Sequence, residues 1–542
     1  MPQGQSKPRW SQAAETVCQH LLNRFQIHLP LLLLWGLPLL LVGFFQLEHQ
    51  SLMAHDEGLY ARRARVIVDS GDWVHPWAAP HHKTPGPYWL LAPFIQLLGR
   101  TEVAVRLPSV VASLVCLGLT YAIGKRLLDQ RAALLGSLSL AVTPLWLQYS
   151  RLATPDIPFT MLILAAVWLL LADSGRWRWF LAGVSLGLAV LMRSFLAALP
   201  VVCLLPYLLL SGRDRLRHWS LYGGVLAGLT PTAVWLLLCW QRYGQAIIDS
   251  LVGFPVSQGL DSYRSTSAFF YLFNLLVNDL GWFFFTMAAA LLLGRRLIQA
   301  LKKTGVKALQ SPQFSLLLAY PLGYLGLLSL ASTKLPHYAL PAYPFLALLA
   351  GYAMERLLTV TRARGLTAVS LVLGLLGGGL VTVAAMLLWP GLLEAADLRP
   401  FAPAALALGL AWLGAGIAWI QGRSTLLWIG LLLLGHWSAL GLAWGTAQLG
   451  NVNPELKTLL LGAEPVLAVE PVGFSPGLDS KRSTLLRFYT PNLGPKLQTL
   501  EQVEPNSFLW IEAPELEQLP DSYRVLGRVD DTLLVQLGPS SP

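Results

Sequence analysis

Long runs of apolar residues alternate with short polar segments over most of the chain. A membrane-spanning helix needs about 20 mostly apolar residues, with roughly 17 to 25 acceptable. Applied to the 542 residues, this length predicts about 13 spanning helices. We place them at 29–47, 103–124, 131–148, 157–173, 178–193, 195–211, 219–240, 271–294, 314–331, 338–355, 366–389, 402–420 and 424–446. The pattern predicts an all-α polytopic membrane protein.

Polar residues dominate at both ends of the chain. Residues 1–28 are polar and basic and precede the first apolar run, which is typical of a tail before an uncleaved signal anchor. Residues 451–542 contain short alternating runs, "SFLWIEA", "YRVLGRV" and "TLLVQL", which predict strands. About 90 residues suffice for a small α/β domain. We therefore expect a tail at 1–28, a transmembrane domain at 29–450 and a C-terminal domain at 451–542.

The first long loop, residues 48–102, is too long for a simple connector. Its segments 56–68 and 88–98 are amphipathic, and we expect each to form a short helix at the membrane interface.

Basic residues gather in alternate loops between the predicted spans. The short segments "GKRLLDQR", "SGRDRLRH", "GRRLIQALKKTGVK" and "ERLLTVTRARG" are rich in Lys and Arg, whereas loops 148–157, 332–337 and 390–401 are poor in them. Short cytoplasmic loops carry such an excess of positive charge. The N-terminus is therefore predicted to be cytoplasmic in a plasma (inner) membrane, and 48–102 and the C-terminal domain to be extracytoplasmic.

The composition agrees with this class of protein. Hydrophobic residues make up 54% of the chain and charged residues 13%, with a mean hydropathy of +0.54. The net charge of +10 fits the anchoring of cytoplasmic loops better than nucleic-acid binding. The spacing of the four cysteines supports neither a zinc site nor a disulfide framework; they are Cys18, Cys116, Cys203 and Cys239.

Acidic residues stand at two positions on the predicted extracytoplasmic boundary. "AHDEGLYARRAR" contains Asp56 and Glu57, with Tyr60 on the following helical turn, and "RLATPDIPFTM" places Asp156 at the start of a span. Each acid is also explained by capping of a helix N-terminus. Because both sites lie on the same side, we expect a shared pocket that holds a general base or a divalent cation.

Lysines among prolines and tyrosines form the third and fourth motifs. "HHKTPGPYW" contains Lys83 and Tyr88, and "STKLPHYALPAYP" contains Lys334 and Tyr338. The lysines are suited to pairing with a lipid phosphate, and the tyrosines to flanking a sugar or a polyprenyl chain. The alternative is snorkelling lysines within an aromatic belt. Four nearby histidines match no ligand signature and are interpreted as interfacial polar residues; they are His55, His81, His82 and His337.

Taken together, these motifs resemble those of a known family. The acidic pair after the first span, "KTPGPYW", "TEVAVRLPS", "TPD" and "KLPHYALPAYP" occur in the order found in membrane glycosyltransferases of the ArnT/PMT type. These are the bacterial aminoarabinose transferases and the related protein O-mannosyltransferases, which share the GT-C fold. The match covers about residues 50–350. The family loop commonly reads Lys-Pro-Pro, and two aromatic residues precede its Trp, so Thr84 and Pro87 depart from its pattern.

The resemblance implies transfer of a sugar from a polyprenyl-phosphate donor to a lipid, glycan or protein acceptor on the extracytoplasmic face. It implies that the pair Asp56–Glu57 is central to catalysis and that Asp156 lies in the same cavity. Lys83 is implied to contact the donor phosphate and Tyr338 to shape the donor cavity.

Elementary chemistry points to the same roles. An acceptor hydroxyl needs a base, which we assign to Asp56, oriented by Glu57. Lys83 and Lys334 stabilise the leaving phosphate. The displacement is expected to invert the anomeric carbon.

Two other functions fit parts of the pattern. A transporter or flippase for lipid-linked sugars is one, but such proteins usually show internal repeats and ionisable groups near the membrane midplane. A non-catalytic membrane scaffold that uses the C-terminal domain to bind partners is the other.

Overall fold

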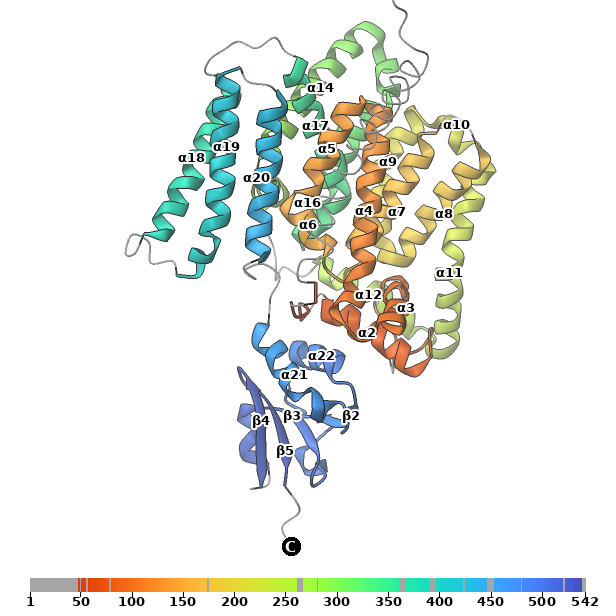
Figure 1. Ribbon diagram of the computed structural model, residues 1–542. Helices are drawn as coiled ribbons and strands as arrows, with labels where there is room; N and C mark the ends of the chain where they lie inside the picture. Colours follow the sequence, from red (N-terminus) through yellow and green to blue (C-terminus); the bar gives the residue numbers. More distant parts are fainter. Residues whose placement is uncertain are drawn as a thin grey trace, which may run out of the picture.

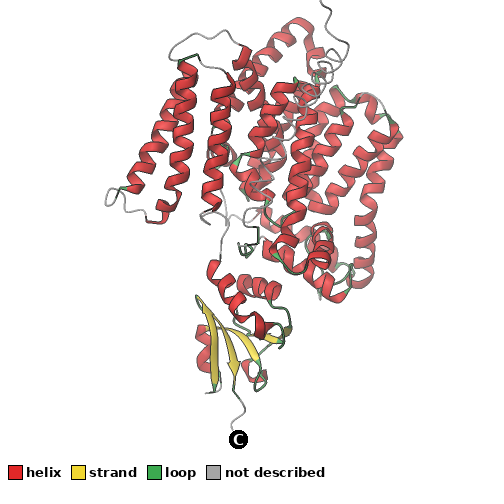
Figure 2. Cartoon of the chain, in the orientation of Figure 1, coloured by secondary structure: helices red, strands yellow, loops and turns green. Residues whose placement is uncertain are grey.

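The computed structural model describes residues 47–48, 50–54, 57–77, 79–172, 175–260, 267–279, 281–359, 367–389, 396–422, 425–445, 453–478, 480–519 and 522–538. The predicted tail 1–28, nearly all of the predicted first span 29–47, His55 and Asp56 lie outside these residues. The described chain forms a large helical bundle with a small α/β domain at one end (Figure 1). The strands drawn in Figure 2 lie in that small domain.

Each of the predicted spans after the first contains one or more helices. They are α4 (Glu102–Leu127), α5 (Gln130–Ala141), α6 (Pro144–Ser150), α7 (Asp156–Leu170), α8 (Arg176–Arg193), α9 (Ala198–Leu210), α10 (Arg213–Leu216), α11 (Trp219–Tyr243), α12 (Ala246–Leu260), α13 (Phe270–Asn278), α14 (Phe283–Thr304), α15 (Pro312–Phe314), α16 (Tyr320–Leu330), α17 (Tyr343–Thr359), α18 (Ala368–Leu388), α19 (Ala402–Ile420) and α20 (Thr425–Gly445).

The bundle is that of an integral membrane protein. Within the described residues, eight helices or helix runs are long and apolar enough to cross a bilayer, or nine if the bent pair α5 and α6 is one span. This number is lower than the 13 predicted, in part because residues 176–210 form one run by this criterion.

Helices α8 and α9 run in opposite directions beside α7. Arg193, the last residue of α8, forms an ion pair with Asp156, the first residue of α7. At the other end of α7, the Tyr207 hydroxyl of α9 donates a hydrogen bond of 2.9 Å to the Leu170 carbonyl. The reversal falls at Ser194, whose φ is +52°. The sequence prediction of two separate spans at 178–193 and 195–211 matches this arrangement.

Three of the predicted spans are less regular than expected. The span at 131–148 is broken between α5 and α6, which are bent by 67° just before Pro144, a residue that has no backbone N–H to continue a helix. The span at 271–294 is interrupted between α13 and α14, where Gly281 has φ +92°. The span at 338–355 begins with the proline-containing 3-10 helix Pro336–Ala342 before α17.

Two short helices lie between the bundle and the small domain. They are α2 (Glu57–Ser70) and α3 (Gly86–Leu98), drawn in red and orange in Figure 1. The sequence predicts helices at 56–68 and 88–98, and α2 and α3 occupy these positions. The buried face of α2 includes Tyr60, Ala64 and Ile67, spaced as expected for an amphipathic helix.

The small domain is built on a five-stranded mixed sheet. Its strands are β1 (Val472–Phe474), β2 (Leu493–Lys496), β3 (Phe508–Glu512), β4 (Tyr523–Val529) and β5 (Thr532–Leu537), in the order β2-β1-β3-β5-β4. β1 pairs in parallel with β2 and β3, whereas β5 pairs antiparallel with β3 and β4. Helices α21 (Pro454–Leu467) and α22 (Ser480–Tyr489) lie on the side nearest α2 (Figure 1). The predicted small α/β domain is confirmed.

Candidate active site

Glu57 forms a fully buried ion pair at the start of α2. Its two carboxylate oxygens accept hydrogen bonds of 2.8 Å from Nε and Nη2 of Arg106 on α4. They also accept bonds of 3.0 Å from the backbone N–H groups of Met53 and Ala153. Glu57 is 0% exposed and Arg106 3% exposed. Four donors therefore occupy this carboxylate.

Arg106 also fixes the backbone that leads to the acidic pair. Its Nη1 donates to the carbonyls of Leu47 and Gln50 at 2.7 and 2.9 Å, and its Nη2 donates to the carbonyl of Ser51 at 3.0 Å. One guanidinium thus ties the segment before α2 to α4, as its planar fork of donors allows.

Asp156 stands at the start of α7 in the same region. It is buried, and its carboxylate pairs with Arg193 at the end of α8. The two acidic segments meet directly, because Ala153, three residues before Asp156, donates its N–H to Glu57. The guanidinium of Arg193 also lies 5.8 Å from the ring centroid of Tyr338.

The loop that carries Lys83 is seated against the end of α8. The Thr84 hydroxyl donates to the Val190 carbonyl at 3.3 Å. A Cβ atom at Gly86 would lie 2.4 Å from the Leu191 carbonyl oxygen, so only glycine permits this approach. The loop is therefore held two to three residues from Arg193.

Lys83 points to the aromatic side chain of Tyr60 on α2. Its Nζ donates to the Tyr60 hydroxyl at 3.1 Å and lies 4.8 Å from the centroid of that ring. The ring of Tyr88 lies 5.6 Å from that of Tyr60. The buried Tyr88 hydroxyl has no hydrogen-bond partner among the described residues, and burial raises the pKa of Tyr88.

His337 belongs to the same cluster. Its Nδ1 is 2.7 Å from the Tyr149 hydroxyl, and the two rings stack at 4.8 Å. Burial, followed by the positive charges of Arg193 and Lys83, lowers the pKa of His337 to about 3. Lys334 is buried three residues earlier in the chain.

We call the described residues Tyr60, Lys83, Tyr88, Asp156, Arg193, His337 and Tyr338 the cation cluster. It lies at the end of the bundle that faces the small domain, and it combines the cationic side chains of Lys83 and Arg193 with tyrosines and one arginine-paired carboxylate. Such a set is suited to binding a phosphate group attached to an apolar chain.

The structure adds residues that the sequence interpretation left out. Arg106 and Arg193 hold Glu57 and Asp156, and the half-buried His337 contacts the Tyr149 hydroxyl. Arg106 and Arg193 could have been identified from the sequence as single arginines inside apolar runs, since charges at membrane depth are usually paired and functional.

Two features lie apart from the cluster. One is an apolar cavity of about 280 Å³ between α14, α17, α18 and α19. The other is an open pocket of about 420 Å³ between α2 and the small domain. Neither is lined by a predicted site residue. No three His, Cys, Asp or Glu side chains come together as a metal site within the described residues.

Known proteins resemble this chain in sequence. Residues 82–238 match the family described as dolichyl-phosphate-mannose-protein mannosyltransferase. The undecaprenyl phosphate-α-4-amino-4-deoxy-L-arabinose arabinosyl transferase of Pseudomonas aeruginosa is 31% identical over 441 residues, covering 76% of this chain and 71% of that protein. The transferase of the same name from Pseudomonas paraeruginosa is 32% identical over 441 residues, with the same two coverages of 76% and 71%.

A solved structure resembles the whole described fold. The crystal structure of ArnT from Cupriavidus metallidurans bound to undecaprenyl phosphate has a TM-score of 0.70 and 18% sequence identity, and the match covers 95% of this chain and 98% of that chain. The helical bundle and the small sheet domain thus share one architecture with that protein.

Proposed function

The chain belongs to the ArnT/PMT-type membrane glycosyltransferases, and on that premise we propose that it moves a sugar from a polyprenyl-phosphate donor to an acceptor at the cation cluster. The observation that carries the proposal is the meeting of the two acidic segments, through Ala153 and Glu57, next to the loop of Lys83. A leaving phosphate needs cations, and an acceptor hydroxyl needs a carboxylate nearby.

The reaction we propose is a direct displacement. The acceptor hydroxyl oxygen attacks the anomeric carbon, the bond from that carbon to the phosphate oxygen breaks, and polyprenyl phosphate leaves. Asp56 takes the hydroxyl proton as general base. Lys83, Lys334 and Arg193 stabilise the charge on the leaving phosphate. Attack from the face opposite the phosphate inverts the anomeric carbon.

Glu57 and Asp156 receive supporting roles in this scheme. Glu57 fixes the start of α2, because its oxygens are occupied by Arg106 and two backbone donors. Asp156 orients Arg193 toward Tyr338. Tyr60, Tyr88 and Tyr338 line the path of the sugar or of the polyprenyl chain.

The proposed topology has 13 spans, a cytoplasmic N-terminus, and the cation cluster and C-terminal domain outside the cytoplasm. The positive-inside distribution of Lys and Arg supports it. The antiparallel course of α8 and α9 supports counting them as two spans, because a single helix of 35 residues would be longer than the roughly 30 Å hydrocarbon core requires.

The donor and the acceptor can be identified by direct transfer. The names of the relatives make undecaprenyl phosphate-α-4-amino-4-deoxy-L-arabinose the first donor to test, beside an undecaprenyl-phosphate-linked hexose. The departures at Thr84 and Pro87 make that comparison necessary. The purified full chain in detergent would be given each donor with a glycolipid of the lipid A type, a polysaccharide or a peptide. Mass spectrometry detects the transferred sugar, and parallel reactions with EDTA or Mg²⁺ test for a divalent cation.

Asp56→Asn is expected to lower kcat at least a hundredfold, the usual contribution of a general base being roughly 10²–10⁴. The matched control is Asp214→Asn, an exposed acid on α10. An unchanged rate in Asp56→Asn would refute the assignment of the base. A wild-type protein that transfers no sugar from any of these donors would refute the function.

The flippase alternative predicts no product in this assay, since detergent leaves no compartments to connect. The relatives named above are transferases, and none of them is named as a transporter.

A further inference from the structure

Tyr489 of the small domain contacts the backbone that precedes the acidic pair. Its hydroxyl accepts a hydrogen bond of 2.9 Å from the Leu52 N–H and donates one of 2.9 Å to Glu102 Oε1. Leu52 is fully buried, and Glu102, the first residue of α4, is nearly so. One hydroxyl of the last residue of α22 thus bridges the segment before Asp56 and the helix that carries Arg106.

Helix α21 and the residues before it contact the same segment. Lys457 pairs with Glu102 and donates to the Glu48 carbonyl. The Asn453 N–H donates to the Ser51 hydroxyl at 3.0 Å. The small domain therefore reaches residues 48, 51 and 52 with three separate side-chain or backbone groups.

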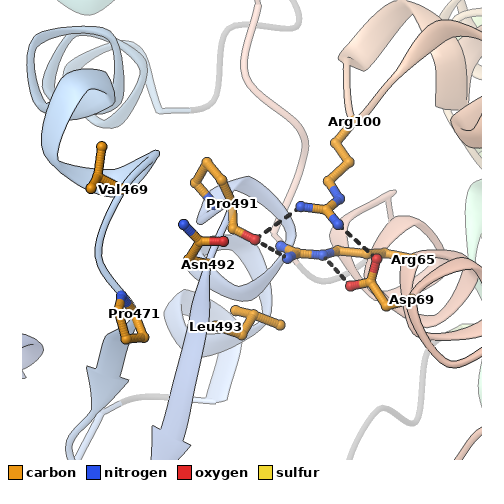
Figure 3. A pocket seen from close by; sticks show the side chains of 8 residues that line it. All are labelled: Arg65, Asp69, Arg100, Val469, Pro471, Pro491, Asn492 and Leu493. Atoms are coloured by element: carbon orange, nitrogen blue, oxygen red, sulfur yellow. Dashed lines mark hydrogen bonds and ion pairs between the residues drawn. The ribbon is translucent and has the colours of Figure 1, made fainter.

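Arg65 of α2 anchors the other side of α22. It is buried, and it donates to the carbonyls of Arg487, Phe488, Thr490 and Pro491. The last carbonyls of a helix have no partner within the helix, and a cation there is favourable. Figure 3 shows Arg65 and Arg100 converging on the Pro491 carbonyl, with Asp69 pairing to both arginines at 2.9 and 2.8 Å. The end of α22, and with it Tyr489, is therefore fixed on α2.

The backbone around the acidic pair is held from two directions. The bundle supplies Arg106, which binds the carbonyls of residues 47, 50 and 51. The small domain supplies Tyr489, which binds the N–H of residue 52. The Met53 N–H then bonds to Glu57, and the Met53 carbonyl accepts from Gly58. These contacts fall on residues 47, 50–53, 57 and 58, on both sides of position 56.

We infer that the C-terminal domain positions the acidic pair for catalysis and that Tyr489 is the positioning residue through which it does so. This rests on the proposed function, in which Asp56 is the base. The domain is then part of the catalytic machinery and not only a cover over the end of the bundle.

Two physical features suit Tyr489 to this role. Burial and the neighbouring Glu102 carboxylate raise the pKa of Tyr489, so its hydroxyl keeps its proton and continues to donate to Glu102 over the working pH range. A hydroxyl can also accept and donate at once, which a phenylalanine ring cannot. Tyr489→Phe keeps the ring in place and removes only the bridge.

The expected effect is local and kinetic. Without the hydroxyl, the buried Leu52 N–H has no acceptor, and Glu102 loses a donor. We expect the Leu52 amide to exchange with deuterium about tenfold faster, which corresponds to one lost hydrogen bond. The kcat of transfer is expected to fall about tenfold while KM for the donor changes less than twofold.

The control is Tyr523→Phe in the same domain, since Tyr523 lies on β4 and is 39% exposed. Both variants are made in the full chain. Hydrogen–deuterium exchange is measured on peptides spanning residues 47–58 and on α20 as an internal standard. Transfer is measured with the donor on which the wild type is active. Glu102→Gln is the second variant; its amide oxygen still accepts from Tyr489, so a smaller change in the same peptide is expected.

Faster exchange in residues 47–58 together with a lower kcat and an unchanged KM supports the inference. If that peptide exchanges at the wild-type rate in Tyr489→Phe, the inference is overturned. It is also overturned if the peptide exchanges faster but the kcat of Tyr489→Phe equals that of the wild type. If Tyr489→Phe cannot be purified, wild-type exchange and kcat in Glu102→Gln overturn it. A wild-type enzyme inactive with every donor refutes the proposed function instead, and the exchange data still decide whether the small domain holds this segment.

Discussion

Substitution of Glu57 by glutamine tests how much the buried ion pair holds in place. The amide keeps the size of the side chain and one acceptor oxygen, but it replaces the other oxygen with an NH₂ group. In the native arrangement the two oxygens receive two bonds from Arg106 and one each from Met53 and Ala153. In the variant, at least two of these donors face another donor.

The magnitude follows from the burial of both partners. Removing one partner of a buried ion pair costs about 3–5 kcal/mol, because the remaining charge is left uncompensated. Arg106 keeps its hydrogen bonds to the carbonyls of residues 47, 50 and 51, so we expect a cost near the lower end of this energy range. Since about 1.4 kcal/mol corresponds to a factor of ten, local opening is expected to become at least a hundredfold more frequent.

Native-state hydrogen exchange measures this opening directly. Peptides covering residues 50–58 and 150–155 are compared between wild type, Glu57→Gln, Arg106→Gln and the double variant, with the exposed Glu517→Gln as control. Transfer activity is followed in parallel and is expected to be lost in both single variants. The double variant carries no buried charge at this site, so its exchange should be slower than in either single variant. Strictly additive effects would show that the two side chains are not coupled and would refute this explanation.

Two further predictions follow from the cluster. Gly86→Ala places a Cβ against the Leu191 backbone, so we expect a loss of about 1–3 kcal/mol in stability and a several-fold higher KM for the donor. In the control Gly378→Ala the new Cβ meets nothing within 4 Å, so neither quantity should change. An unchanged KM in Gly86→Ala would contradict the contact between the Lys83 loop and the end of α8. The pKa of His337 is lowered from 6.5 to about 3, so the unfolded chain binds a proton there that the folded chain does not, and stability is lost as pH falls from about 6.5 toward 3. In His337→Gln the unfolding temperature in detergent should fall less over this range, and an unchanged pH dependence would count against a half-buried neutral imidazole.

The regular parts of the fold are those that the sequence predicts best. An apolar run of spanning length or a strict alternation is a local property, so the helices α4, α11 and α18 and the strands β3 to β5 follow from it. β1 and β2 were not predicted, because "VGF" and "LGPK" are too short and contain glycine or proline. They are strands because β1 pairs in parallel with both β2 and β3, which are contacts between separate segments of the chain.

The candidate site could be predicted only in part from the sequence, for the same reason. Proline-rich motifs and acids at predicted span ends marked Lys83, Asp156 and their surroundings. Which arginine pairs with which acid depends on where Arg106 of α4 meets the first residue of α2 and on how α8 packs on α7. Periodicity carries no information on such pairs. The contact of Tyr489 could not be predicted from the sequence either, since 437 residues separate it from the Leu52 amide that it binds.

The arginine pairings also narrow the choice of the base. A carboxylate takes a proton from an acceptor only through an oxygen lone pair that is free to receive it. The oxygens of Glu57 receive four donors, and Asp156 is paired with Arg193, so proton transfer by either acid would first require breaking a buried ion pair. Of the three acids in the two motifs, Asp56 is the one that the proposed mechanism leaves for this step. In the mechanism that we propose, the two arginine-paired acids hold the start of α2 and the guanidinium of Arg193 in place for the base and the leaving phosphate.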